Sequence, residues 1–189
     1  MSRSLFALCF FAVSFAAAGS LHGQVAPSAT ERSLTVRAGA FASVFQPDYY
    51  APWGVEGTSP NRIYGPGAYV DIHVSRWIQP EVEMRWLRFN AQYGVDQDTY
   101  SIGERLPIVN FHKFTPYGKF LVGLGHGSWL TGNALVLSYG GGVDYRLSRR
   151  FTLRAADLEY QRWFVSSPLI GDFAVKPYGV SAGMSYRVF

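Results

Sequence analysis

The chain has 189 residues, of which 48% are hydrophobic and 16% charged, with a formal net charge of +4 and a single cysteine. This length allows one domain. The 16% aromatic content excludes an intrinsically disordered chain, because disordered chains are poor in such residues. One cysteine excludes a disulfide scaffold. The lysines and arginines are scattered along the chain, which argues against nucleic acid as a partner.

The first segment has the order of a secretory signal peptide. A positively charged start precedes the apolar run 5–18, and small residues follow that run. The run is too short to span a bilayer as a mature helix. Cleavage is equally compatible with a site after Ala18, Ser20 or Gly23. We therefore expect a signal peptide over residues 1–23, with cleavage within 18–24, and a mature domain over 24–189.

Past this segment, apolar and polar residues alternate with a period of two, which is typical of strands that bury one face. No later apolar stretch is long enough for a membrane helix. No helical pattern separates the segments, so neighbouring strands should pair antiparallel. The pattern predicts eight strands: 34–45, 64–74, 81–86, 100–108, 117–124, 135–147, 151–160 and 178–188.

The connections between these strands alternate in length. Three are short, 75–79, 109–114 and 148–150; four are long, 46–61, 90–99, 125–133 and 164–175. All long loops then lie at one end, as in outer-membrane barrels, which have tight periplasmic turns and longer outer loops. Loop 46–61, with Tyr49, Tyr50 and Trp53, is the best candidate for contacting an external partner, whose identity the sequence does not indicate.

The composition of the two faces predicts which one lies inside. The polar face carries charges of both signs in near balance, as a packed interior ion network needs: Arg37, Arg85, Arg105, Lys119, Arg146, Arg154 and Arg187 against Asp71, Glu81, Glu83, Asp144, Asp157 and Glu159. Glycines recur on that face, where they would make room for long Arg and Glu side chains. His73 should pair there with a carboxylate. The apolar face then contacts lipid, and eight strands leave no open channel.

Aromatic residues gather toward the predicted strand ends, as amphipathic rings do at membrane interfaces. Those near the long loops are Tyr64, Tyr100, Trp129 and Trp163; those near the short turns are Trp77, Phe111, Phe114, Tyr145, Phe151, Tyr186 and Phe189.

Three residues and one change of parity fit this pattern poorly. Glu104 falls on the lipid face, so we expect it near an interface. Pro66 and Pro107 each lack a ladder donor, which places them at strand ends or bulges. The seventh strand changes parity, and a one-residue bulge near Ala155 and Ala156 would restore it.

The final part of the last strand, 181–188, has a polar residue, a glycine and alternating hydrophobic residues, and Phe189 follows one place beyond. It resembles the terminal signal that outer-membrane barrels present to their insertion machinery. With the signal peptide and eight strands, the chain over 24–189 resembles the OmpA-like family of small outer-membrane barrels. This resemblance implies an all-β, eight-stranded antiparallel up-and-down transmembrane barrel in the outer membrane of a double-membraned bacterium. Its partners would be membrane lipids and the insertion machinery, and its role structural or surface recognition.

No residues stand out as catalytic, cofactor-binding or metal-binding. The four histidines are far apart and lack other ligands at metal spacing. His126 and Ser128 resemble the His-x-Ser of lipid A deacylases, but Trp129 follows where that family has Asn, and Asp144 falls on the opposite face. We therefore predict a protein that is not an enzyme and has no cofactor. The alternatives are a lipid A deacylase-like hydrolase of the outer membrane and a soluble periplasmic ligand-binding barrel.

Overall fold

The computed structural model describes residues 34–48, 61–75, 78–91, 95–109, 111–168 and 171–188. The predicted signal peptide, the aromatic residues of loop 46–61, Trp77 and Phe189 lie outside these residues. In the ranges described, no helix is long and apolar enough to cross a membrane.

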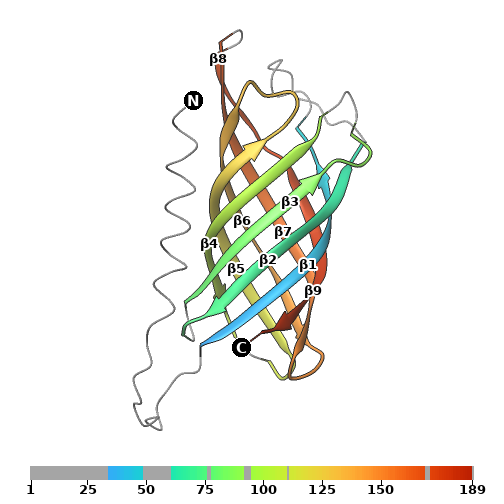
Figure 1. Ribbon diagram of the computed structural model, residues 1–189, viewed down its shortest axis with the longest axis vertical. Coiled ribbons are helices and arrows are strands. Elements are labelled where there is room, and N and C mark those ends of the chain that lie inside the picture. Colours follow the sequence, from blue (N-terminus) through green and yellow to red (C-terminus); the bar gives the residue numbers. More distant parts are fainter. Residues whose placement is uncertain are drawn as a thin grey trace. The chain divides into compact units, whose positions relative to one another are not determined.

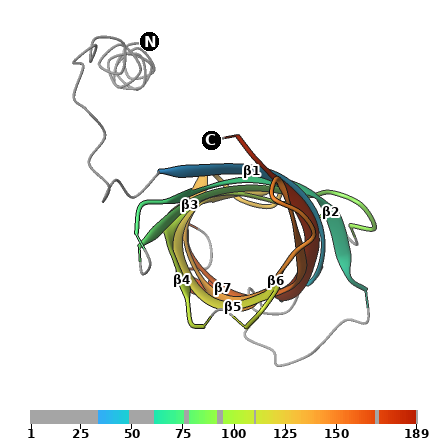
Figure 2. The same ribbon diagram turned by 90° about the horizontal axis from the view of Figure 1, so that it is seen from below.

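The described part of the chain contains nine strands (Figure 1). In chain order they are β1 (Thr35–Gln46), β2 (Ile63–His73), β3 (Gln79–Leu87), β4 (Gln97–Pro107), β5 (Phe114–His126), β6 (Asn133–Arg146), β7 (Phe151–Ser167), β8 (Gly171–Val175) and β9 (Tyr178–Arg187). Each strand from β1 to β7 pairs antiparallel with the next, and β9 pairs with both β7 and β1. Eight strands therefore form a closed wall (Figure 2), in which every backbone polar group can find a partner without an open edge.

The eight predicted strands correspond to the eight strands of this wall. Strands β3, β4 and β5 are longer than predicted because they begin before the regular alternation does, whereas β1 and β2 have the predicted lengths, shifted by one residue. The predicted loop 164–175 is wrong in part. Strand β7 continues to Ser167 and pairs with β8, from Trp163↔Val175 to Ser167↔Gly171, so a hairpin extends the wall at this end. Its turn contains Pro168 and Gly171, and Gly171 has a φ of +79° that favours glycine.

The irregular positions lie where the sequence placed them. The pairing of β7 with β9 shifts between Arg154 and Asp157, which confirms the bulge at Ala155 and Ala156. Pro107 ends β4. Pro66 lies beside a break in the β2–β3 ladder: the pairing Gly67↔Arg85 gives way to the bridge Tyr64↔Phe89, one residue out of register. The missing N–H of Pro66 is therefore accommodated by an interrupted ladder.

Candidate functional site

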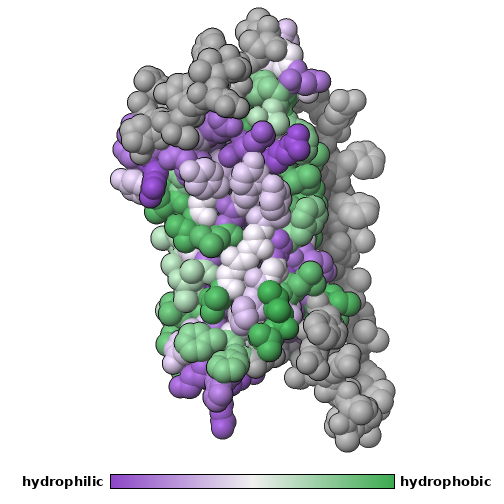
Figure 3. Space-filling model, turned by 180° about the vertical axis from the view of Figure 1, so that it is seen from behind, coloured by the Kyte–Doolittle hydropathy of each residue, from purple (hydrophilic) through white to green (hydrophobic). Residues whose placement is uncertain are grey.

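The outer wall of the barrel is apolar over its middle. Strand residues of one parity are exposed and mostly hydrophobic, among them Val70, Val82, Ile102, Phe120, Val122, Leu124, Leu135, Tyr139, Leu158, Val180 and Met184. The space-filling view shows hydrophobic and weakly polar residues over the middle and hydrophilic residues toward both ends (Figure 3). Monomeric soluble proteins rarely expose a continuous apolar surface of this extent, whereas a lipid bilayer requires one.

Aromatic residues border this surface at both ends. On the long-loop side Tyr64 stacks on Phe89, with ring centroids 6.0 Å apart, and Trp86 Nε1 donates a hydrogen bond to the Tyr100 hydroxyl at 3.1 Å. On the short-turn side the ring pairs are Phe114–Tyr145 and Phe151–Tyr186. Their positions agree with two interfacial belts.

Glu104 lies on the outer face of β4, and its side chain is exposed. It lies three residues before the end of that strand, opposite Pro80. The Glu104 carboxylate accepts a hydrogen bond from the backbone N–H of Gln79 at 3.2 Å. Its position toward the strand end agrees with the expectation of an interfacial site, where a charge costs less than at mid-membrane.

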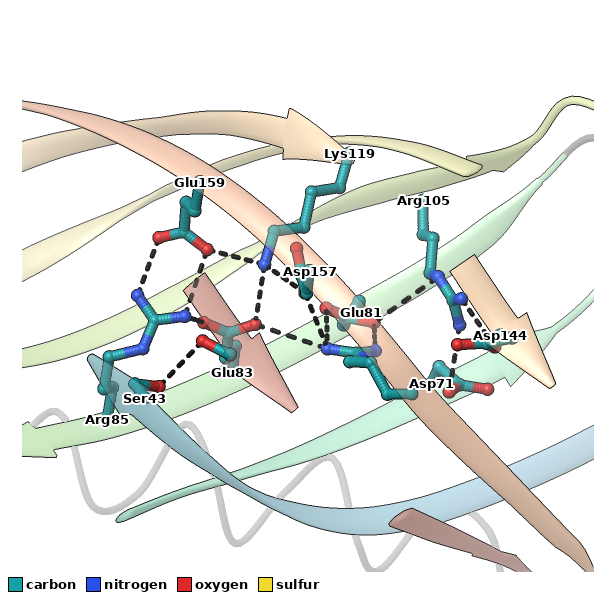
Figure 4. A network of polar contacts seen from close by, with 12 residues as sticks. Ser43, Asp71, Glu81, Glu83, Arg85, Arg105, Lys119, Asp144, Asp157 and Glu159 are labelled. Atoms are coloured by element: carbon teal, nitrogen blue, oxygen red, sulfur yellow. Dashed lines mark hydrogen bonds and ion pairs between the residues drawn. The ribbon is translucent and has the colours of Figure 1, made fainter. Parts of the chain in front are cut away.

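The lumen is filled by a network of ion pairs (Figure 4). At its centre the Lys119 ammonium lies 2.5 Å from Glu159 Oε2, 2.8 Å from Asp157 Oδ2 and 3.1 Å from Glu83 Oε2. Arg85 binds Glu159 through both terminal nitrogens, at 2.9 and 3.1 Å, and lies 2.5 Å from Glu83. These groups come from β3, β5 and β7, so the network connects opposite sides of the wall.

The network continues toward the short turns. Arg154 donates to both oxygens of Glu81, at 2.6 and 3.4 Å, and to Asp157 at 3.2 Å. Arg105 lies 2.6 Å from Asp144 and 3.6 Å from Asp71. His73 Nδ1 is 3.1 Å from Asp71, as the sequence predicted for this histidine. Each buried charge thus has an opposite charge nearby, which a water-excluded interior requires.

The predicted seven-to-six charge balance is wrong for the enclosed region. All six predicted carboxylates are buried there, but of the seven cations only Arg85, Arg105, Lys119 and Arg154 are. Arg37 is half-buried, and Arg146 and Arg187 are exposed. These three lie at or near strand ends on the short-turn side, where the alternation places a residue on the inner face but the wall no longer encloses it.

Several glycines of the inner face make room for aromatic rings, where the sequence analysis expected long Arg and Glu side chains. A Cβ on Gly39 would lie 2.5 Å from the Tyr69 ring, and a Cβ on Gly125 would lie 2.3 Å from the Trp163 ring. The Tyr69 ring in turn lies 3.7 Å from the Arg154 guanidinium carbon. Arg105 lies 3.6 Å from the centre of the Tyr117 ring. The rings therefore pack against the cations and add cation–π contacts to the ion pairs.

An apolar cluster fills the lumen on the long-loop side. Trp163 is fully buried and packs with Ala134, Val136, Val165 and Val175, with Trp129 against it at a centroid distance of 6.2 Å. The prediction that Trp163 belongs to the interfacial belt is therefore wrong, because β7 keeps its inward parity to this residue. Trp163 Nε1 donates to Gln161 at 2.8 Å, and Gln161 Nε2 donates to Glu159 at 2.6 Å, which connects the cluster to the ion network.

The structure does not assemble His126, Ser128 and Asp144 into one site. Asp144 binds Arg105 on the short-turn side, whereas His126 ends β5 at the other side. His126 Nδ1 lies 3.3 Å from Asn133 Oδ1. The Ser128 hydroxyl donates to Asp96 Oδ1 at 2.7 Å, and the Ser128 backbone N–H donates to the same oxygen at 2.6 Å. Burial raises the pKa of Asp96, but these hydrogen bonds outweigh it and hold that pKa below its usual value.

Asp96 is a partner that the sequence reasoning missed. The register of β4 with β5 explains the contact. Asp98 pairs with His126, so two residues beyond this pair Asp96 faces Ser128. Among the residues described, no group of three or more His, Cys, Asp or Glu side chains could hold a metal ion.

The arrangement of an apolar wall, aromatic borders and an ion-paired interior defines an integral β-barrel of the outer-membrane kind. Comparison with solved structures agrees with this fold. Neisserial surface protein A has a TM-score of 0.55 at 17% identity, covering 81% of this chain and 96% of its own. The outer membrane protein OprG of Pseudomonas aeruginosa has a TM-score of 0.50 at 11% identity, covering 82% and 95%.

No family model matches the chain. No curated protein matches it either. The resemblance to small outer-membrane barrels is thus confirmed at the level of the fold: the described strands form an eight-stranded β-barrel of the outer-membrane type.

Proposed function

We propose that this barrel is a closed, non-enzymatic membrane component whose role is structural or one of surface recognition through its long-loop end. The observation that carries the proposal is the filling of the lumen. Arg85, Lys119 and Arg154 are buried with their carboxylates across the middle, and Trp163 is buried beyond them. An eight-stranded barrel has an interior just wide enough for its own side chains, so this filling leaves no continuous water path.

The surface suited to recognition is the β7–β8 hairpin. It extends the wall beyond the β9 pairing, because β9 pairs with β7 only as far as Tyr160↔Tyr178, whereas β8 pairs with β7 out to Ser167. In the described residues β8 has β7 as its only strand partner. The hairpin therefore presents a strand edge at the long-loop end, and such edges can accept a further strand.

The conductance of the purified barrel in planar lipid bilayers tests the closed lumen. We expect no stable single-channel conductance for the wild-type protein. A Trp163→Ala variant tests which part closes the barrel, because it removes the largest side chain of the apolar cluster while the ion network stays. We expect it to remain non-conducting, since Arg85 and Glu159 still cross the lumen. A wild-type barrel with steady open-channel currents would contradict the proposal.

The absence of enzymatic activity is tested on lipid A. The hydroxyl of Ser128 donates to Asp96, and Asp144 binds Arg105 toward the other end of the barrel, so these residues do not form the serine, histidine and acid arrangement of nucleophilic catalysis. Expression of the wild-type chain and of a His126→Ala variant in the same host should give identical lipid A acylation profiles by mass spectrometry. Loss of an acyl chain with the wild-type protein alone would show that the barrel is a hydrolase.

A further inference from the structure

A polar cavity of about 400 Å³ opens at the short-turn end of the lumen. Its lining comes from seven strands and two turns: Arg37, His73, Ser75, Gln79, Arg105, Pro107, His112, Lys113, Thr115, Asp144, Arg146 and Thr152. The Arg105–Asp144 pair is buried, and beyond it the lumen is filled by the ion network. His112, Lys113 and Arg146 are exposed. The cavity is therefore a pocket with a buried floor and an exposed rim, and its volume is in the range of small-molecule sites.

The charge of this cavity is strongly unbalanced. Four cations line it, Arg37, Arg105, Lys113 and Arg146, against the single carboxylate of Asp144. Arg105 lies 2.6 Å from Asp144, which neutralises that pair. Among the described residues, no carboxylate lies within ion-pair distance of Arg37, Lys113 or Arg146. Asp71 and Asp144 attract Arg37 at longer range, but both carboxylates already contact Arg105, so the cavity keeps an excess of positive charge.

This arrangement differs from the rest of the lumen. In the ion network each cation contacts at least one carboxylate, and Lys119 contacts three. Like charges around a cavity repel one another, and half-burial of Arg37 removes part of the water that would screen them. A multivalent anion would remove this repulsion. It would also accept hydrogen bonds from the guanidinium groups of Arg37 and Arg146, whose geometry suits phosphate oxygens. Thr115 and Thr152 line the same cavity with hydroxyl groups, which suits oxygen-rich ligands.

We propose that the short-turn end of this barrel is a binding site for a phosphate-bearing small anion, held by Arg37, Arg146 and Lys113. A phosphate monoester carries between one and two negative charges near neutral pH, so it matches several cations better than a single carboxylate does. The group comes either from a water-soluble molecule or from the headgroup of a membrane lipid.

Titration with inorganic pyrophosphate tests the site, with the full barrel in an uncharged maltoside detergent and heat release measured by calorimetry. We expect saturable one-site binding that weakens as salt is added. Replacing Arg37 and Arg146 together by methionine should weaken binding by at least about tenfold, since hydrogen bonds between charged groups are the strong ones. The matched control is Arg150→Met: Arg150 lies at the same end, donates to the Tyr186 hydroxyl at 3.2 Å and does not line the cavity. It should bind within about twofold of wild type.

Folding of each variant is checked by the mobility of unboiled protein on a detergent gel. Absence of saturable pyrophosphate binding would overturn the proposal. So would an Arg150→Met variant that weakens binding as much as the Arg37 and Arg146 double variant does, because that result indicates non-specific adsorption to the basic rim. The source of the phosphate is decided in nanodiscs. If the ligand is a soluble molecule, pyrophosphate should bind equally in phosphatidylcholine and phosphatidylglycerol discs. If the ligand is a lipid headgroup, the phosphatidylglycerol headgroups should occupy the site, so pyrophosphate binding should be lost in those discs and kept in phosphatidylcholine discs.

Discussion

The Arg85 guanidinium binds the Glu159 carboxylate through two nitrogen–oxygen contacts of 2.9 and 3.1 Å across the barrel, and both side chains are buried. Arg85 also packs against the Phe45 ring at 4.5 Å from its centroid. The pair joins β3 to β7, which are not neighbours in the wall. It therefore acts as a brace inside the cylinder, held by geometry that only a planar, bidentate cation provides.

Replacing Arg85 by methionine should destabilise the barrel by about 3–5 kcal/mol, because Glu83 and Glu159 lose a buried counter-charge. The free energy of unfolding in guanidinium chloride, with the barrel in phospholipid vesicles, measures this loss. The double variant Arg85→Met with Glu159→Met should lose less than the single variant, since one buried charge of each sign is removed. An exposed cation, Arg162, provides the control, and Arg162→Met should change stability by less than about 0.5 kcal/mol. A loss for the double variant equal to the sum of the losses of Arg85→Met and Glu159→Met alone would show that the pair is not coupled.

The apolar cluster at the long-loop end predicts a second effect on stability. Trp163 is fully buried among Ala134, Val136, Val165 and Val175. Trp163→Ala should cost about 3–5 kcal/mol through lost transfer energy and a residual cavity. Trp163→Phe keeps most of the packing and loses the hydrogen bond to Gln161, so it should cost less than the alanine variant. Equal unfolding free energies for wild type and Trp163→Ala would mean that this end of the lumen is not packed.

Two glycines on adjacent strands give a matched pair of predictions. A Cβ on Gly103 would lie 2.1 Å from the carbonyl oxygen of Phe120, a backbone atom that cannot move without shifting β5. A Cβ on Gly118 has its nearest neighbour at 3.8 Å. Gly103→Ala should therefore destabilise the barrel by about 1–3 kcal/mol, and Gly118→Ala should be near neutral. Unfolding free energies of the two variants under identical conditions check this; a larger loss for Gly118→Ala would contradict the register of β4 with β5.

The sequence predicts the strands of the wall well, because a period of two determines which face of the wall each side chain lies on. Once Val70 and Val82 face outward, Asp71 and Glu81 must face inward, and a shift by one residue would reverse every side chain. The pairing of His73 with Asp71 follows from the same parity. The inward position of Trp163 was missed because an apolar residue on the polar face looks like the end of the alternation, although Glu159, Gln161 and Trp163 share one parity.

The pairing of charges across the lumen could not be predicted from the sequence. Parity places Lys119, Arg85 and Glu159 inside, but their contacts depend on the tilt and closure of the wall, which bring non-neighbouring strands together. The contact between Ser128 and Asp96 is a different case. It follows from extending the β4–β5 register by two residues, which requires the strand bounds to be known first.

Ionisation of Asp96 should be visible at the Ser128 amide. The pKa of Asp96 is held below its ordinary 3.8, because hydrogen bonds from Ser128 outweigh the effect of burial. A carboxyl group with a lowered folded pKa contributes stability above its unfolded value, and that contribution is lost as the pH falls through the folded value. The chemical shift of the Ser128 amide proton, followed by NMR in micelles, should therefore titrate with a midpoint below 3.8.

The Ser128→Ala variant removes the hydroxyl hydrogen bond, one of those that stabilise the ionised form of Asp96. It should move the midpoint upward toward 3.8, with the amide still reporting the titration. A midpoint at or above 3.8 in the wild-type barrel would contradict the contact between Asp96, just before β4, and Ser128, just after β5.

The lipid-facing assignment of the outer wall predicts a cost that depends on depth. Val122 lies near the middle of β5 on the exposed face, with Ile102 and Leu137 as its neighbours across the two ladders. Val122→Arg should destabilise the barrel in phospholipid vesicles by about 2–4 kcal/mol. The matched control is Leu147→Arg, at the exposed short turn after β6, where the cost should fall to about 0–1 kcal/mol. In a soluble barrel both positions would face water, so two equally small losses would refute a wall in contact with lipid.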